Sequence, residues 1–476
     1  MMRRLITLLA ALLSLAVVPA AHAYSSPEVG MADDGVLLNG TDSQISSTVS
    51  TWQGIGISSV RVFVRWGDIA PARTAKKMPA GFDPSNSSDP GYNWGKIDRA
   101  VGATAGAGLK VYLTITGSGP LWAMSSPSNG SNGRRNPSPT KYAQFAEAVA
   151  ERYGSQVSDY ILYNEPNQTL WLQDQSTCRK GKCVPHAPHV YRKLVRAAYP
   201  KIKAADSGST VLIGALSPSG TTPTARSHNL RPLTFLRAFG CVDKKYKPIR
   251  SGECKSFKPA MGDGFAYHPH GVGLAPNKHA KNRDAAQMGD LSRLTNVLDK
   301  LTRKKRLKVN GASKFPLYFD EYGYQTNPPD RFGVSLSLQA KYLRQGAYVA
   351  WRNSRVRLLT QYSYIDDAFA KGGAGWQAGL LTRAGDAKPS FAVFPNPFWA
   401  QKIKAGTVQL WGQVRPGSGV RSVQLQRRSG NSWVTIQTVN TDARGYYYAN
   451  VSNPATTTYR AVTPAGTTAT GTIFGR

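Results

Sequence analysis

Two stretches of sequence decide the fold: Tyr160-Ile161-Leu162-Tyr163-Asn164-Glu165-Pro166 and Leu317-Tyr318-Phe319-Asp320-Glu321-Tyr322-Gly323. In each stretch an apolar run ends at a glutamate, and a turn follows directly. The carboxyl ends of parallel strands meet at one edge of a sheet or barrel, where functional side chains collect. The two stretches therefore predict that Glu165 and Glu321 meet at one site, although they lie far apart in the chain.

Similar apolar runs alternate with helical patterns along most of the chain. Residues 142–153 and 336–349, for example, show the spacing of apolar residues that is typical of helices. Alternating strands and helices predict an α/β fold, and about eight strands favour a (β/α)8 TIM barrel with long insertions. By this count Glu165 follows the fourth strand and Glu321 lies at the end of the seventh. The expected strands are 60–64, 109–115, 160–163, 211–216, 264–267, 317–319 and 358–362, with an earlier one at 36–38.

The pattern changes after Pro395-Asn396-Pro397, where residues 401–476 alternate between apolar and polar side chains. Turn sequences such as Ser429-Gly430 and Arg444-Gly445 separate the segments. This predicts a small C-terminal antiparallel β-sandwich of immunoglobulin-like type at 398–476, after a catalytic domain at 24–397. The large aromatic residues of this domain, among them Trp411 and Trp433, either fill its core or form a platform for sugars.

The first residues and the cysteines indicate export. Residues 1–23 combine a basic start, a short apolar run and the small-residue sequence Ala21-His22-Ala23, as in a secretory signal peptide cleaved near Ala23. The four cysteines form two local pairs, 178 with 183 and 241 with 254, which predicts two disulfides. A zinc site from the first pair with His186 or His189 is the alternative, but a second ligand pair at zinc-binding spacing is missing. A secreted protein is therefore expected.

The chain is strongly basic, with 60 Lys and Arg against 27 Asp and Glu and a net charge of +33. Such a charge attracts polyanions, so an anionic cell envelope or an acidic glycan is an expected partner. The sequence contains no nucleic-acid-binding motif and, in the mature chain, no apolar run long enough for a transmembrane segment. We expect a monomer that binds neither nucleic acid nor a membrane interior.

The sequences Tyr163-Asn164-Glu165-Pro166-Asn167 and Phe319-Asp320-Glu321-Tyr322-Gly323 resemble two motifs of glycoside hydrolase clan A. These enzymes are retaining (β/α)8-barrel glycosidases, and families 5 and 39 are the most similar. The resemblance covers roughly residues 28–397. It implies that Glu165 is the general acid/base and Glu321 the nucleophile, with carboxyl groups about 5 to 5.5 Å apart.

The resemblance also assigns substrate-binding residues. Arg61 is the expected partner that keeps Glu321 ionised, and Asn164 is expected to bond the sugar hydroxyl next to the anomeric carbon. His268 is expected to line the cleft, and Tyr322 and Trp376 to contact the sugar. Strict alternation along a strand points Asp320 away from Glu321, so Asp320 is left out of the site. The clan's reaction requires neither a metal nor an organic cofactor.

The sequence therefore predicts a secreted retaining O-glycoside hydrolase that cleaves poly- or oligosaccharides by double displacement. The alternative is a non-catalytic, cationic carbohydrate- or cell-envelope-binding protein on the same barrel. Transglycosylation by the same residues is a third reading. Xyloside, glucan, galactoside and acidic exopolysaccharide all stay open as substrates, and the basic charge favours the last.

Overall fold

The computed structural model describes residues 24–126, 132–157, 159–369, 375–452 and 457–472. The predicted signal peptide at 1–23 lies outside the described residues. Within the described part, no helix combines the length and the apolar character that crossing a membrane requires.

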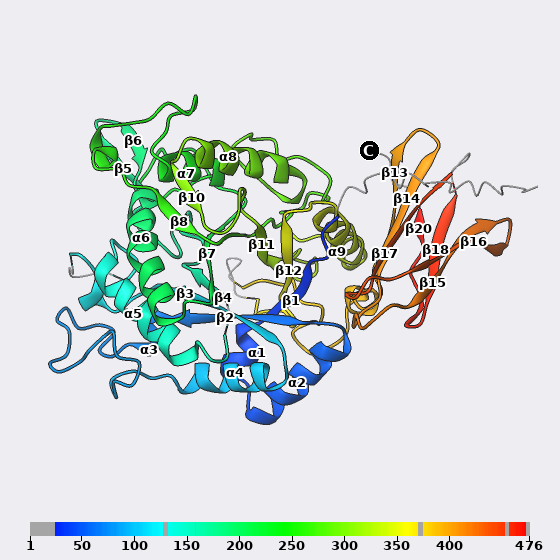
Figure 1. Cartoon of the computed structure of the whole chain (residues 1–476), viewed down its shortest axis with the longest axis horizontal. Coiled ribbons are helices and arrows are strands. Elements are labelled where there is room, and N and C mark those ends of the chain that lie inside the picture. The colour runs from blue at the N-terminus through cyan, green and yellow to red at the C-terminus, as the bar shows by residue number, and fades with distance from the viewer. Residues whose placement is uncertain (1–23, 127–131, 158, 370–374, 453–456, 473–476) are drawn as a thin grey trace, which may run out of the picture.

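Eight parallel strands close into a barrel, which confirms the predicted fold (Figure 1). Each strand pairs with the barrel strands before and after it in the chain, and the last pairs with the first. Side chains such as Tyr112, Ile161, Leu212 and Leu358 form a buried cluster contributed by different barrel strands. The barrel strands are β1 (Glu28–Ala32), β2 (Ser59–Arg65), β3 (Lys110–Thr116), β4 (Asp159–Leu162), β7 (Thr210–Leu216), β9 (Gly264–Tyr267), β11 (Leu317–Tyr322) and β12 (Val356–Tyr362).

The predicted first strand at 36–38 is wrong. These residues belong to a short helix, Asp34–Asn39, and the first strand precedes it at Glu28–Ala32. The side chain of Asp33 accepts a hydrogen bond from the Val36 amide at 3.1 Å and caps the helix. A short apolar run does not distinguish a strand from a buried helical turn, and here the capping aspartate decides for the helix.

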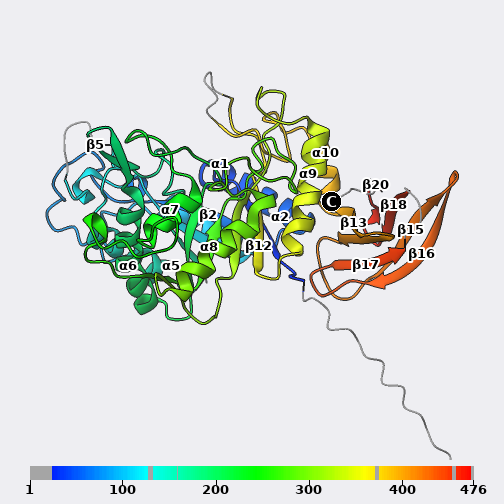
Figure 2. The ribbon, with the colours of Figure 1, turned by 90° about the horizontal axis from the view of Figure 1, so that it is seen from above.

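Helices surround the barrel, as Figures 1 and 2 show. Their ends follow ordinary sequence rules: in α5, for example, Ser138 is the N-cap and Pro139 occupies the first turn. The helices are α1 (Asp34–Asn39), α2 (Asp42–Gly54), α3 (Trp66–Ile69), α4 (Gly95–Gly106), α5 (Pro139–Tyr153), α6 (Ala187–Ala205), α7 (Pro232–Phe239), α8 (Leu291–Arg303), α9 (Leu336–Trp351) and α10 (Pro389–Val393), with 3-10 turns at Leu121–Ala123, Gly252–Cys254 and Met288–Asp290.

Two disulfides close the insertions between barrel strands, as predicted. Cys178 and Cys183 join β5 (Ser176–Arg179) to β6 (Lys182–Pro185), and Cys241 and Cys254 close the loop after α7. His186 lies 2.5 Å from Glu253, so the hairpin and the loop contact each other. A second two-stranded sheet pairs β8 (Ala260–Gly262) with β10 (Leu307–Val309).

The C-terminal part is a β-sandwich, which confirms the second half of the predicted fold. One sheet has the order β13-β14-β17 and the other β16-β15-β18-β19, with β20 on β18. Phe398 and Leu410 of the first sheet share a core with Val423, Leu425 and Tyr459 of the second. The immunoglobulin-like assignment stays a prediction. The strands are β13 (Phe398–Lys404), β14 (Thr407–Gln413), β15 (Ser422–Ser429), β16 (Ser432–Asn440), β17 (Tyr446–Ser452), β18 (Thr458–Thr463), β19 (Gly466–Thr467) and β20 (Gly471–Thr472).

Helix α9 lies between the barrel and the sandwich (Figures 1 and 2). Its Tyr348 and Trp351 pack against Trp411 at centroid distances of 5.8 and 6.0 Å. Trp411 is therefore a buried packing residue and not a sugar platform. Trp433 is only partly buried and lies under the guanidinium of Arg460, 4.3 Å from the ring centroid.

Candidate active site

Glu165 lies in the turn that ends strand β4. Tyr163 and Glu165 have φ values of 69° and 36°, in the left-handed region that residues with a Cβ rarely adopt. The Glu165 amide donates to the Ala215 carbonyl at 2.9 Å, which holds the turn against the neighbouring strand. Such conformations persist where the surrounding structure imposes them, and they collect at functional sites. The regular pleat therefore ends here, as a joint role of Asn164 and Glu165 requires.

Glu321 lies near the end of strand β11, and its side chain is 9% exposed. Its Oε1 accepts a hydrogen bond from Arg61 Nη2 at 2.6 Å. Its Oε2 lies 3.5 Å from His268 Nδ1 and 3.5 Å from His270 Nε2. Cationic or donor groups thus surround this carboxylate.

The two glutamates meet at one nitrogen. His268, directly after strand β9, places Nδ1 3.0 Å from Glu165 Oε1 and 3.5 Å from Glu321 Oε2. Because both oxygens contact the same nitrogen, the distance between Glu165 Oε1 and Glu321 Oε2 is at most the sum of these two contact distances. This limit is compatible with the carboxyl separation of about 5 to 5.5 Å in retaining glycosidases.

Arg61 supplies the charge that distinguishes the two glutamates. It is fully buried on β2, where its Nη1 contacts Asp34 Oδ2 at 3.0 Å and its Nη2 contacts Glu321. Asp34 also accepts from the Phe63 amide at 2.8 Å, and the Phe63 ring lies 3.8 Å from the Arg61 guanidinium. A buried arginine held in this way by two carboxylates has a fixed direction.

The electrostatics of the cluster favour an ionised Glu321. Burial alone raises the pKa of this carboxyl, but His268, Arg61 and His270 outweigh burial and lower the pKa to about 2. Burial lowers the pKa of His268, yet Glu321 and Asp320 together raise it well above its ordinary value. Both ring nitrogens of His268 thus face carboxylates, Nδ1 toward Glu165 and Glu321 and Nε2 toward Asp320.

His270 and Trp376 form the wall of the site next to Glu321. Their rings lie 4.8 Å apart, and Tyr362 at the end of β12 lies 5.9 Å from Trp376. Among the described residues, neither ring nitrogen of the buried His270 has a hydrogen-bond partner at normal distance. Buried polar groups normally form hydrogen bonds, so the His270 ring is suited to bind a hydroxyl group of a ligand at this carboxylate cluster.

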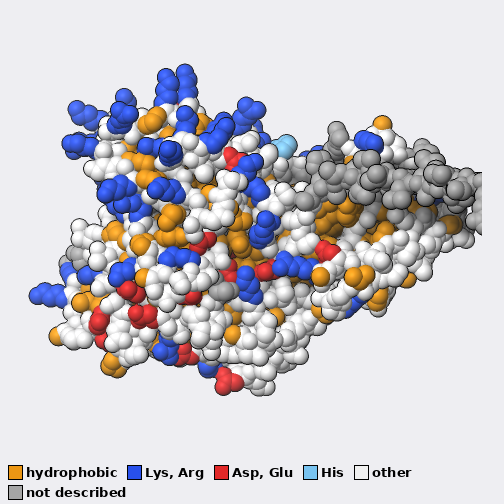
Figure 3. All heavy atoms as spheres, in the orientation of Figure 1, with side chains coloured by type: hydrophobic (Ala, Val, Ile, Leu, Met, Phe, Trp, Pro, Cys, Tyr) orange, Lys and Arg blue, Asp and Glu red, His pale blue; other side chains and the backbone are white. Residues whose placement is uncertain are grey.

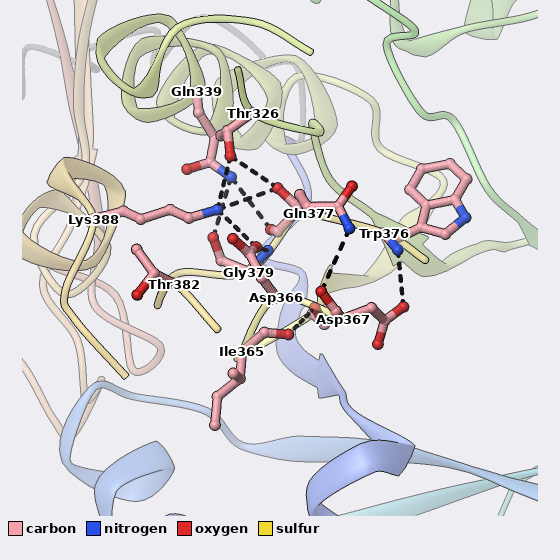
Figure 4. Close-up of polar contacts among 12 residues, drawn as sticks. Thr326, Gln339, Ile365, Asp366, Asp367, Trp376, Gln377, Gly379, Thr382 and Lys388 are labelled. Atoms are coloured by element: carbon pink, nitrogen blue, oxygen red, sulfur yellow. Dashed lines mark hydrogen bonds and ion pairs between the residues drawn. The ribbon is translucent and has the colours of Figure 1, made fainter. Parts of the chain in front are cut away.

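A buried polar network fixes the segment that carries Trp376 (Figure 4). Trp376 donates its backbone N–H to Asp367 Oδ2 at 2.9 Å. Lys388 Nζ contacts Asp366 Oδ1 at 2.7 Å, Thr326 Oγ1 at 2.9 Å and the Gln377 carbonyl at 3.1 Å. Burial lowers the pKa of Lys388 while Asp366 raises it, and the net direction is downward. The ion pair joins the loop after β12 to α10.

Two predicted site residues, Asn164 and Tyr322, have different surroundings. Asn164 is buried, donates its backbone N–H to Thr116 Oγ1 at 3.1 Å and leaves Oδ1 without a partner among the described residues. Tyr322 needs correction: it packs 5.8 Å from Tyr324 and its hydroxyl points to the α9 carbonyl of Tyr342, 3.4 Å away. Its hydroxyl therefore points toward α9, outside the barrel, and not toward the carboxylate of Glu321.

The exclusion of Asp320 from the site also needs correction. Its Oδ2 lies 3.2 Å from His268 Nε2, within the cluster, although strict alternation excluded it. The pairing of β11 with β12 shifts register between Phe319 and Tyr322, so alternation fails at this point. A register shift of this kind has no signal in the sequence.

Sequence reasoning missed two further residues of the cluster, Asp34 and His270. His270 had a signal, because it follows His268 by two positions in His268-Pro269-His270. Asp34 had none, because the segment around it reads equally well as a strand. Its position follows from the capped helix α1.

Within the part of the chain that the structure describes, two groups of side chains have ligand atoms close enough for a metal. His268, His270 and Glu321 place theirs within 4.8 Å of one another. The other group, His189 with Cys241 and Cys254, offers no thiolate because the two cysteines form a disulfide. The disulfide group is therefore structural, whereas the first group belongs to the carboxylate cluster around His268.

Comparisons with known proteins support the fold. No protein-family model matches the chain, and no curated protein matches it in sequence. Among solved structures, the chain is similar to a family 39 glycoside hydrolase from the gut symbiont Bacteroides cellulosilyticus WH2, with a TM-score of 0.52 and 14% identity over 90% of this chain and 81% of that one. A GH5_18 protein from Streptomyces cattleya in complex with Manβ1-4GlcNAc has a TM-score of 0.49 and 15% identity over 77% and 78% of the two chains. The first likeness shows a shared fold.

Proposed function

We propose that this protein is a secreted retaining O-glycoside hydrolase with Glu165 as acid/base and Glu321 as nucleophile. One observation carries the proposal. Two carboxyl groups from β4 and β11 meet at His268 Nδ1, and Arg61 contacts only one of them. A retaining glycosidase needs two carboxyl groups in different environments, because one attacks as a carboxylate and the other gives a proton.

In the first step, Glu321 forms a bond to the anomeric carbon while the bond from this carbon to the leaving oxygen breaks. Glu165 gives its proton to that oxygen. In the second step, Glu165 removes a proton from water, whose oxygen bonds to the anomeric carbon and releases Glu321. Arg61 keeps Glu321 ionised and directed throughout.

The walls of the site fit a sugar. Asn164 Oδ1 and His270 Nδ1 are buried polar atoms without hydrogen-bond partners among the described residues, and His270 Nε2 has only the distant Glu321 Oε2 at 3.5 Å. Trp376 offers an aromatic face beside them, 4.8 Å from the His270 ring. Sugars combine hydroxyl groups with apolar C–H faces, so these groups suit a monosaccharide next to Glu321.

The test is a screen of the mature protein against neutral and acidic poly- and oligosaccharides, with the anomeric configuration of new reducing ends followed by NMR. We expect release of products with retained configuration. Inverted products, or no turnover of any glycan together with no labelling of Glu321 by mechanism-based glycosidase inactivators, would contradict the proposal.

Replacement of Glu165 by Ala is expected to affect substrates according to their leaving groups. Glycosides with poor leaving groups need the proton and should lose about 10²- to 10⁴-fold in kcat/KM, whereas dinitrophenyl glycosides should lose far less. Added azide should restore turnover of the activated substrate and give a glycosyl azide of retained configuration. Equal losses on both substrate types would argue against this role.

A second function, adhesion to an anionic polymer, is favoured by the surface charge. Figure 3 shows Lys and Arg side chains gathered over the insertions around α7, α8 and the β5–β6 hairpin. Arg306 Nε bonds the Gly240 carbonyl at 2.7 Å, and Lys300 lies 4.8 Å from the Tyr246 ring centroid, so the basic segments form one face. The exposed cations of this basic face are Lys244, Lys245, Lys247, Arg250, Arg303, Lys304, Lys305 and Lys308.

Neutralising part of the basic face is expected to weaken binding to a polyanion. The triple variant Lys244→Gln, Lys245→Gln, Lys247→Gln should lose several-fold in affinity for immobilised alginate, with a shallower dependence on salt. The control carries Arg421→Gln, Arg427→Gln and Arg428→Gln in the sandwich and has the same net charge. Equal losses in the two variants would show that only net charge matters and not this face.

The organisation around the site is also part of the proposal. The leader would occupy residues 1–23, the catalytic domain 24–397 and the sandwich 398–476, in a monomer. The two disulfides fit an extracellular protein.

A further inference from the structure

A second cationic site lies on the β2 side of the cleft, beside the catalytic cluster. The alternate residues Arg61, Phe63 and Arg65 follow one another along β2. The Phe63 ring lies 3.8 Å from the Arg61 guanidinium and 5.0 Å from that of Arg65. One aromatic ring therefore separates Arg65 from the arginine that holds Glu321.

Arg65 lines a cleft of about 420 Å³, a size that ordinary ligand sites have. Its walls come from the end of β2, from α1, from α3 and from the beginning of α4. The charged residues that line it are Arg65, Asp68, Arg73 and Lys96. Asn39 and Asn93 add polar side chains to the wall.

The carboxylates near this cleft are already paired. Asp68 forms an ion pair with Arg73. Asp34, which lies next to the cleft, accepts from Arg61 and from the Phe63 amide. Neither carboxylate therefore neutralises the remaining two cations.

Arg65 and Lys96 are those remaining cations. Among the described residues, no carboxylate lies within ion-pair distance of either, and Lys96 Nζ bonds only the neutral Asn39 Oδ1 at 2.9 Å. Arg65 is partly buried, and its position over the Phe63 ring restricts its guanidinium. A restrained guanidinium presents a fork of N–H groups that matches a carboxylate.

We propose that this cleft is a subsite for an acidic sugar, in which Arg65 binds the carboxylate of a uronic acid residue and Lys96 adds a second positive charge. The inference rests on the proposed glycosidase function and names its substrate class. The acidic residue would lie beside the sugar that Glu321 attacks. The enzyme would then select glycans by a charge next to the scissile bond.

The test compares uronate glycans before and after carbodiimide-mediated reduction of their carboxyl groups, which keeps every linkage and removes only the charge. The probes are oligosaccharides of glucuronoxylan, gellan, polygalacturonate and alginate. Turnover is measured with the wild type, and binding with the Glu321→Gln variant by calorimetry. We expect at least one native glycan to exceed its reduced form by about 10- to 100-fold in kcat/KM or affinity.

The variants assign this preference to residues. In Arg65→Met, the kcat/KM or affinity for the native glycan should exceed that for the reduced glycan by no more than about threefold. The kcat/KM or affinity for the reduced glycan should stay near the wild-type value. Arg65→Lys should keep part of the preference, because it retains the charge and loses the fork. Arg357→Met, an exposed arginine at the start of β12, removes the same charge at the opposite end of a barrel strand and is the control. If thermal melting shows that Arg65→Met does not fold, Lys96→Met replaces it as the test variant.

Three results would overturn the subsite. In the first, the wild type turns over native and reduced glycans equally and Glu321→Gln binds them equally. In the second, Arg65→Met loses the same factor on both forms of the glycan. In the third, Arg357→Met abolishes the preference for the native glycan to the same extent as Arg65→Met. Failure of the glycosidase proposal is distinct: it appears as no turnover of any glycan, while binding of acidic glycans to the Glu321→Gln variant still tests the subsite.

Discussion

Replacing Glu321 by Gln is expected to lower kcat at least about 10⁴-fold on every glycan that the wild type cleaves. The amide is nearly isosteric with the carboxyl group but cannot form the glycosyl ester that the double displacement requires. Folding should persist, because the amide oxygen still accepts from Arg61. The measurements are steady-state kinetics, thermal melting and mass spectrometry of the protein after a mechanism-based inactivator, which should label Glu321 in the wild type alone.

The matched control is Glu151→Gln, a carboxyl group exposed on α5, which should keep wild-type kinetics. Chemical rescue adds a second criterion. In a Glu321→Gly variant, azide should enter the vacant space and convert an activated glycoside to the azide of inverted configuration. Turnover by Glu321→Gln within tenfold of the wild type would remove Glu321 from the mechanism.

Replacing Arg61 by Met is expected to cause the largest loss of stability among single changes in the site. The guanidinium is fully buried, and its removal leaves Asp34 and Glu321 without their shared cation. Breaking a buried pair in this way costs about 3 to 5 kcal/mol in the free energy of unfolding. Denaturant unfolding measures the loss. The control Arg99→Met removes an exposed pair with Asp42 and should cost less than about 1 kcal/mol.

The same variant should change the pH dependence of activity. Burial raises the pKa of Glu321, and His268, Arg61 and His270 together lower it to about 2, so the nucleophile stays ionised in mildly acidic solution. Without Arg61, the pKa of Glu321 moves upward. The acidic limb of kcat/KM should therefore shift to higher pH, measured from about pH 3 to pH 8. An unchanged acidic limb would show that Arg61 does not control the nucleophile.

The stability of the folded protein should also depend on pH through the ionised Glu321. Its folded pKa lies below the ordinary value for a glutamate, so its ionisation favours the folded state at neutral pH. This contribution is lost as the pH falls from the ordinary value toward about 2. The Arg61→Met variant should lose less stability on acidification than the wild type does.

The barrel and the sandwich were predictable because hydrophobic periodicity is a local property. Runs such as 211–216 and the alternation in Val423-Gln424-Leu425-Gln426 each indicate how a segment buries its apolar side chains. The two cysteine pairs were predictable for a similar reason, since each closes a short loop. The misassigned segment at 36–38 shows the limit, because three apolar residues suit a strand and a capped helical turn alike.

The composition of the site was only partly predictable. Glu165, Glu321 and Arg61 had a sequence signal, because charged residues rarely occur within or directly after buried strands without a function. Tyr322 shares a motif with Glu321 but points its hydroxyl toward α9. Asp320 enters the cluster through a register shift between β11 and β12.

The sequence by itself determined that two glutamates would end two parallel strands of one barrel, because burial patterns and turn residues act over a few positions. Only the tertiary structure decided how the two differ. Arg61, which Asp34 holds through an ion pair, contacts Glu321 and not Glu165, and His268 contacts both glutamates. Charge interactions depend on distance through space, and barrel closure sets those distances among residues that are far apart in the chain.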